Sequence, residues 1–123
     1  LLLEDLAHVP GSEWVFAPFF GEPKATLTSL GRLTKIARAE AIPCMGYSER
    51  DGSGWRVRFD PPLSDFPSGD AEQDATAMNT ALERLVEADP AQYMWTLRWF
   101  KTRPEGVSTP YPGRRRGKGE DET

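Results

Sequence analysis

Residues 92–104, Gln-Tyr-Met-Trp-Thr-Leu-Arg-Trp-Phe-Lys-Thr-Arg-Pro, form the stretch around which the rest of this chain is organised. Aromatic rings seat such a segment against a protein core or a lipid surface, and cations beside them are suited to binding phosphate or carboxylate groups. A terminal amphipathic helix with buried rings and solvated cations explains the same spacing, so both interpretations remain open. The side chains concerned are Tyr93, Trp95, Arg98, Trp99, Phe100, Lys101 and Arg103.

The composition of the chain restricts the class of protein. With 123 residues it forms one domain or a piece of a larger one, and its formal net charge of -4 argues against a nucleic-acid partner. The single cysteine, Cys44, excludes an internal disulfide and indicates a reducing compartment. One histidine and one cysteine give no cluster of metal ligands, so neither a metal nor another cofactor is implied. The chain begins with leucine, which processing and truncation both explain.

The first residues contain two candidate sites. Leu1–Leu3 is an apolar run that predicts a buried strand, and Asp5 follows at its carboxyl end, where ligands of α/β sheets gather. His8 and Glu13 are separated by four residues, the spacing of a catalytic base and the acid that orients it. The loop between them contains Pro-Gly, which holds such a pair poorly in register. We therefore interpret this pair as a coincidence and not as a catalytic site.

The next segments predict a strand and a long helix. Val15–Pro18 lies in an apolar run that ends at Gly21, and Lys24–Ala41 has the apolar spacing of a helix starting near Pro23. A strand followed by glycine and a helix would leave backbone N–H groups free to meet an anion. Four basic side chains would share one side of this helix, either as a solvated face or as a surface for an acidic partner or anionic headgroups: Lys24, Arg32, Lys35 and Arg38.

The remaining segments complete a prediction of an α/β fold. Ile42–Ser48 and Trp55–Phe59 predict a hairpin with one buried face. Along the second strand Trp, Val and Phe alternate with two arginines, so the apolar side chains are expected on that buried face. Asp70–Ala88 predicts a second helix with acids in its first turn and an apolar stripe. We expect the strands to form a layered sheet covered by the two helices. Residues 108–123 carry many charges and little to bury, which predicts a disordered tail.

Several short motifs occur in a characteristic order along residues 1–107. They are Phe19-Phe20-Gly21, Ala25-Thr26-Leu27-Thr28, Pro61-Pro62-Leu63 and the string from Gln92 to Pro104. The last of these is the most specific, because it combines Gln-Tyr-x-Trp with Arg-x-Phe-Lys-Thr-Arg-Pro. In this order the motifs resemble the bacterial lipid A biosynthesis acyltransferases, the family of the lauroyl and myristoyl enzymes of lipopolysaccharide assembly.

The resemblance implies a function and a partial fold. Residues 1–107 would be the carboxyl-terminal half of the enzyme domain, part of a glycerolphosphate-acyltransferase-like layered sheet with flanking helices. Such enzymes move a fatty acyl chain from acyl-carrier protein to a hydroxyl of a lipid A precursor, at the anionic cytoplasmic face of the bacterial inner membrane. Their catalytic His-x4-Glu pair and anchor helix lie upstream of the matching region, so this chain alone is expected to be inactive. The substrate-binding positions implied are Asp5, Phe20, Gly21, Arg98, Lys101 and Arg103.

Two departures and one alternative limit these expectations. Leu6 stands where the family usually has Gln, and Leu97 stands where the closing string usually has His. An isolated half should leave a sheet edge and an apolar face uncovered. The alternative function is a non-catalytic module that binds anionic lipid or an acidic protein partner. The acyl chain length and the acceptor hydroxyl do not follow from the sequence.

Overall fold

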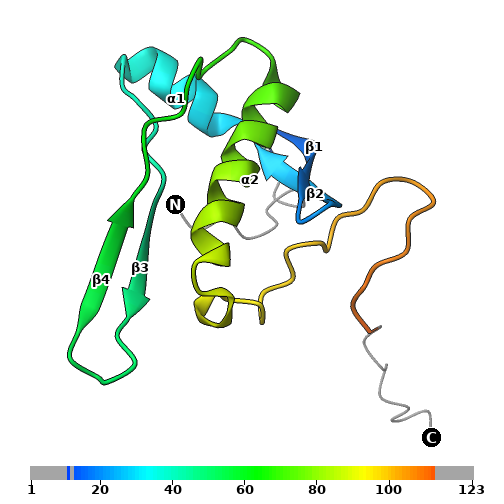
Figure 1. Ribbon diagram of the computed structural model, residues 1–123. Helices are drawn as coiled ribbons and strands as arrows, with labels where there is room; N and C mark the ends of the chain where they lie inside the picture. Colours follow the sequence, from blue (N-terminus) through cyan, green and yellow to red (C-terminus); the bar gives the residue numbers. More distant parts are fainter. Residues whose placement is uncertain (1–10, 12, 113–123) are drawn as a thin grey trace, which may run out of the picture.

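The computed structural model describes residues 11 and 13–112. Helix α2 (Ala71–Glu87) lies between two β-hairpins (Figure 1). The α/β class predicted from the sequence is confirmed. The layered sheet is not seen among the described residues, because their strands form separate two-stranded sheets. The strand predicted at Leu1–Leu3 lies outside the described residues.

The first hairpin pairs β1 (Trp14–Phe19) with β2 (Glu22–Leu27), with Phe19 opposite Glu22. The two turn residues between them, Phe20 and Gly21, have φ angles of 51° and 79°. Two successive positive φ angles are typical of the type I′ turn, whose twist matches that of a hairpin. The helix predicted from Lys24 is therefore wrong at its start, because cross-strand pairing with β1 overrides the helical spacing of this segment.

Helix α1 (Ser29–Ala37) is shorter than the sequence predicted. Its C-cap residue, Arg38, adopts the left-handed conformation with φ 51°. The predicted basic stripe is also wrong as a unit, because Lys24 lies on β2 and is buried while Arg32, Lys35 and Arg38 are exposed.

The second hairpin pairs β3 (Cys44–Ser48) with β4 (Trp55–Phe59), as predicted. The prediction that the apolar side chains of the second strand form the buried face is wrong. The large apolar side chains of β4 face solvent, whereas Tyr47 of β3 is buried and its hydroxyl donates a hydrogen bond to the Leu85 carbonyl of α2. The exposed side chains are Trp55, Val57 and Phe59.

Helix α2 (Ala71–Glu87) confirms the second predicted helix. Asp70 caps it, since its Oδ1 accepts hydrogen bonds from the backbone N–H groups of Glu72 at 2.9 Å and Gln73 at 3.2 Å. One side of α2 packs against β1 and supplies much of the core. Its buried apolar residues are Ala75, Met78, Ala81, Leu85 and Val86.

The chain after α2 contains one short 3₁₀ helix, η1 (Pro90–Gln92), and then runs through turns to residue 112. The amphipathic terminal helix considered for residues 92–104 is therefore wrong. None of the helices formed by the described residues has the length and apolar composition needed to cross a bilayer. Residues 92–104 are called the closing segment below. Of the predicted tail, residues 113–123 lie outside the described part, and Tyr111 contacts the closing segment through a hydrogen bond from Phe100 N.

We expect replacement of Gly21 by alanine to destabilise the protein by about 1–2 kcal/mol, because the left-handed turn then carries a Cβ atom. Gly46→Ala is the matched control, since Gly46 lies in β3 and a Cβ there would meet Trp55 at an ordinary 4.0 Å. Urea unfolding measures both free energies. Equal stabilities of the two variants would contradict a strained turn at Gly21.

Candidate functional site

Aromatic side chains from the end of β1, from the β1–β2 turn and from the closing segment lie close to one another. We call them the aromatic cluster. The Phe20 ring lies 5.7 Å from the Trp95 ring, and Tyr93 stacks on Trp99 with centroids 5.2 Å apart. The structure therefore joins two motifs that are far apart in the sequence. The members of the cluster are Phe19, Phe20, Tyr93, Trp95, Trp99 and Phe100.

The aromatic cluster has a buried part and an exposed part. Phe19 and Trp99 are buried, while Phe20 and Trp95 are 39% and 46% exposed. Burial raises the pKa of Tyr93 to about 12, so its phenol remains neutral at physiological pH. Part of the cluster thus belongs to the protein core. Phe20 and Trp95 form an exposed aromatic tip that is suited to apolar or interfacial contact.

Side-chain hydrogen bonds hold the closing segment in its irregular shape. The indole Nε1 of Trp95 donates to the Pro90 carbonyl at 2.7 Å, and that of Trp99 donates to the Met94 carbonyl at 2.8 Å. Each of these carbonyls also accepts a hydrogen bond from a backbone N–H three residues later, Tyr93 N and Leu97 N, so each indole adds a second bond to a local turn. These indole bonds stabilise successive turns in place of the helix that the spacing indicated.

Gln92 joins the closing segment to the second hairpin. Its Oε1 accepts a hydrogen bond from Ser48 N at 2.7 Å, and its Nε2 donates to Ser48 O at 3.0 Å and to Asp89 Oδ2 at 2.8 Å. The side-chain amide thereby pairs with β3 as a neighbouring strand would. The sequence analysis assigned no role to Gln92 beyond its place at the start of the Gln-Tyr-x-Trp motif. That place was the one signal in the sequence that pointed to its structural role.

Lys24 is the most deeply buried cation of the described chain. Its Nζ lies 5.7 Å from the centroid of Phe19 and 5.8 Å from that of Trp99, and the residue is 3% exposed. Aromatic faces stabilise such a charge through their negative quadrupole. Lys24 therefore belongs to the core under the aromatic cluster and not to a surface stripe.

The three cations of the closing segment have different environments. Arg103 donates to the Pro23 carbonyl at 3.1 Å and to Glu22 Oε2 at 2.9 Å, and only 10% of its side chain is exposed. Arg98 and Lys101 are both exposed, and Arg98 lies 5.7 Å from the Tyr111 ring. No ion pair of Arg98 or Lys101 is formed with the described residues. Of the three, these two are available to an external anion.

The other predicted site residues are placed as follows. Phe20 and Gly21 form the β1–β2 turn, where Glu83 Oε1 accepts a hydrogen bond from Phe20 N at 2.7 Å. The predicted anion site at a strand–glycine–helix junction is therefore wrong, because no helix follows Gly21 and a carboxylate occupies the Phe20 N–H. Glu13 is exposed and lies 3.8 Å from Arg32. Asp5 and His8 lie outside the described residues.

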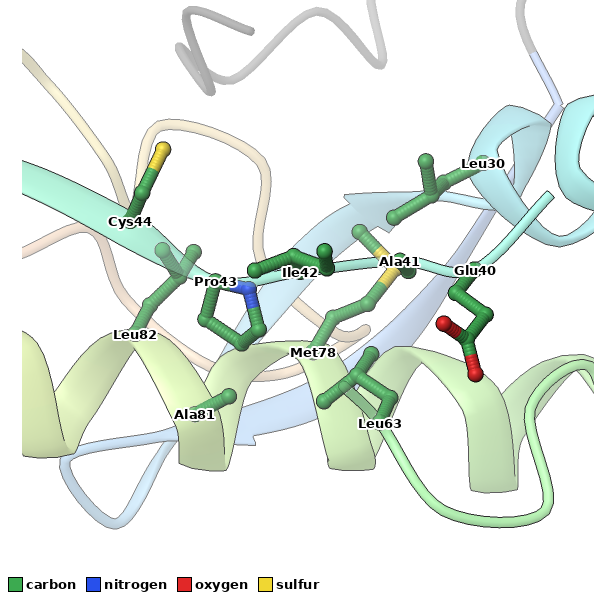
Figure 2. A pocket seen from close by; sticks show the side chains of 10 residues that line it. All are labelled: Leu30, Glu40, Ala41, Ile42, Pro43, Cys44, Leu63, Met78, Ala81 and Leu82. Atoms are coloured by element: carbon green, nitrogen blue, oxygen red, sulfur yellow. The ribbon is translucent and has the colours of Figure 1, made fainter. Parts of the chain in front are cut away.

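A second feature, which sequence reasoning missed, is an apolar pocket of about 310 Å³ between α1, α2 and the start of β3 (Figure 2). Ile42, Pro43 and Cys44 form one wall, and α2 forms another. Glu40 supplies the one carboxylate of the lining. The other lining side chains are Leu30, Ala41, Leu63, Met78, Ala81 and Leu82.

Comparison with known proteins identifies the family. The family of bacterial lipid A biosynthesis acyltransferases matches residues 2–102. The chain belongs to this family. The resemblance seen in the sequence motifs is thus confirmed, together with the acyltransferase and lipid A assignments that define the family.

Among curated relatives, this acyltransferase family member is 40% identical over 98 residues to the lipid A biosynthesis lauroyltransferase of Escherichia coli, covering 79% of the chain and 32% of the relative. It is 35% identical over 109 residues to the lipid A biosynthesis myristoyltransferase of Escherichia coli, covering 89% of the chain and 33% of that relative. It is 36% identical over 92 residues to a lipid A biosynthesis acyltransferase of Haemophilus influenzae, covering 75% of the chain and 28% of that relative. The chain spans about a third of the length of these relatives.

We expect Arg103→Ala to destabilise the protein by roughly 1–2 kcal/mol, because it removes the hydrogen bonds that tie the closing segment to β2. Much of this loss comes from the bond to the Pro23 carbonyl, since the Glu22 side chain is 60% exposed and its ion pair is screened. Arg98→Ala and Lys101→Ala are the matched controls and should change the free energy of unfolding by less than about 0.5 kcal/mol. Urea denaturation followed by tryptophan fluorescence measures all three, and equal losses would refute this division of roles.

Proposed function

We propose that this chain is the carboxyl-terminal part of an enzyme that transfers a fatty acyl chain from acyl-carrier protein to a hydroxyl of a lipid A precursor. The observation that carries the proposal is the family match over residues 2–102. Coverage of about a third of the relatives supports the view that further polypeptide completes the enzyme. The complete protein would then have the glycerolphosphate-acyltransferase-like layered fold and act at the cytoplasmic face of the inner membrane.

The proposed chemistry is general base catalysis. A histidine takes the proton of the acceptor hydroxyl while a glutamate orients its imidazole, and the oxygen attacks the thioester carbonyl carbon. The carbon–sulfur bond breaks, and the imidazolium returns the proton to the leaving thiolate. The single histidine of this chain, His8, precedes Glu13 by five positions with Pro10-Gly11 between them in the sequence, so we assign the catalytic pair to the remaining part of the enzyme.

This chain would contribute the surface that meets the anionic acceptor. Arg98 and Lys101 are exposed cations of the same segment as Trp95, whose ring lies 5.7 Å from that of Phe20, and both rings are partly exposed. Rings of this kind favour the membrane interface, and cations attract phosphate groups. Arg103 would position the segment and Gly21 would allow the turn that presents Phe20. Asp5 is retained as a site residue on the family resemblance.

A non-catalytic module that binds anionic lipid or an acidic protein is the second candidate. It is favoured by the exposed basic residues of α1, Arg32 and Lys35, and by Arg38 directly after it. These lie outside the closing segment, so the two candidates predict different surfaces. An upstream reading frame that encodes His-x4-Glu would support the enzyme, whereas a gene starting near Leu1 would support the module.

We expect the protein encoded by the complete reading frame that contains this chain to transfer acyl groups from acyl-carrier protein to a lipid A precursor. Residues 1–123 alone should show no turnover, because the proposed catalytic pair is encoded elsewhere. Mass spectrometry of the acylated lipid measures both. Turnover by the 123-residue chain would overturn the assignment, and its loss in His8→Ala would then identify His8 as the base.

Removal of Arg98 and Lys101 together should weaken binding of the complete enzyme to vesicles that contain phosphatidylglycerol by about 30-fold at low salt. Each cation near an anionic surface contributes about 1 kcal/mol, and 1.4 kcal/mol corresponds to a factor of ten. The effect should decrease at high salt, with an unchanged melting temperature.

Arg84→Ala is the control for loss of one charge elsewhere, because Arg84 is an exposed cation of α2. Lys35→Ala tests the second candidate in the same assay. Undiminished binding in the double variant would refute a role for the closing segment, and a larger effect of Lys35→Ala would favour the surface of α1.

A further inference from the structure

The outward side of the second hairpin is an apolar surface without a partner among the described residues. Trp55, Val57 and Phe59 are 75%, 56% and 70% exposed on it. Their cross-strand neighbours Ser48, Gly46 and Cys44 add no charge. We call these six residues the outer face of the hairpin.

The opposite side of the hairpin is already in use. It holds the buried Tyr47, whose hydroxyl donates to the Leu85 carbonyl, and Arg56 lies 5.0 Å from the Tyr47 ring. The hairpin is thus fixed to α2 through one side and presents its more hydrophobic side outward. This inverts the usual arrangement, in which the apolar side of a strand faces the core.

The outer face continues into the apolar pocket. Cys44 is paired with Phe59 in the hairpin and also lines the pocket, beside Ile42, which is 52% exposed (Figure 2). The free edge of β4 borders the same surface, since β4 pairs only with β3 among the described strands. An unpaired edge, an apolar sheet face and an apolar pocket thus form one continuous surface.

We propose that the rest of the same acyltransferase polypeptide covers this surface, by adding a strand to the free edge of β4 and placing apolar side chains on the outer face and in the pocket. This rests on the proposed function, because the covering polypeptide exists only if the chain is part of a longer enzyme. The relatives contain about twice as much additional sequence as the part this chain matches. A two-stranded hairpin is marginally stable by itself, and an apolar surface of this kind marks an interface.

The chemistry of the outer face favours protein over lipid as its occupant. Its six residues include no cation that would meet an anionic headgroup, whereas the closing segment does carry such cations. Alternating large side chains on a strand with a free edge are suited to a sheet that is continued and covered. A second copy of this chain would cover the face but would leave the additional sequence of the relatives unexplained.

Thiol labelling of Cys44 tests the proposal in unmodified protein. In the 123-residue chain Cys44 is exposed and should react rapidly with a maleimide, whereas in the complete enzyme it should react at least about tenfold more slowly. Peptide mapping by mass spectrometry assigns the label to Cys44. Equal labelling rates in the two proteins would overturn the proposal.

Val57→Lys provides the second measurement. In the complete enzyme it should lower the melting temperature by roughly 5 °C or more, because it buries an unpaired charge, and in the 123-residue chain it should have no effect. Val107→Lys is the matched control, since Val107 is 43% exposed and lies outside the outer face. Val107→Lys should leave the melting temperature of the complete enzyme nearly unchanged. An equally unchanged melting temperature for Val57→Lys in the complete enzyme would contradict the proposal.

Two further outcomes identify other occupants and would also overturn it. A dimer of the 123-residue chain that Val57→Lys dissociates, seen by sedimentation, would assign the face to a second copy. Loss of vesicle binding by the complete Val57→Lys enzyme, with unchanged melting, would assign it to lipid. Acyl transfer by the wild-type enzyme is measured separately, so an active enzyme with a freely labelled Cys44 refutes the docking and leaves the proposed function intact.

Discussion

Leu85 of α2 has no exposed surface, and its carbonyl accepts the hydrogen bond of the buried Tyr47 hydroxyl. On another side of the same helix, Asn79 donates to the Ala17 carbonyl of β1 at 3.4 Å and to Thr26 Oγ1 of β2 at 2.9 Å. Both hairpins are therefore attached to α2 by buried polar contacts in addition to apolar packing. Such contacts are costly to leave unpaired, so they define how each hairpin is placed on the helix.

The closing segment depends on this arrangement. Gln92 pairs with Ser48 of the second hairpin, and Arg103 binds Glu22 and the Pro23 carbonyl of the first. The segment thus connects two sheets that share no strand. Because Trp99 is buried and Arg103 is bonded to the first hairpin, Arg98 and Lys101 are the exposed cations of the segment. The specific family string therefore contains mostly residues that hold the segment in shape.

The structure also separates two kinds of exposed surface. The aromatic tip with Arg98 and Lys101 combines apolar and cationic groups, which suits an anionic lipid surface. The outer face of the second hairpin is apolar and uncharged, which suits continued protein packing. We propose that both surfaces belong to one acyltransferase, since the family matches residues 2–102 and the chain covers about a third of its relatives.

The sequence by itself determined the elements whose signals are local. Asp70 and the apolar stripe of α2 indicated that helix, alternation indicated the second hairpin, and the string at residues 92–104 indicated the family. Only the tertiary structure decided that residues 22–27 form a strand, because that strand depends on pairing with β1 across a turn with two positive φ angles. The same holds for the burial of Lys24, the structural role of Arg103 and the outward side of the second hairpin. Each depends on contacts with residues distant in sequence, which the spacing within a segment does not encode.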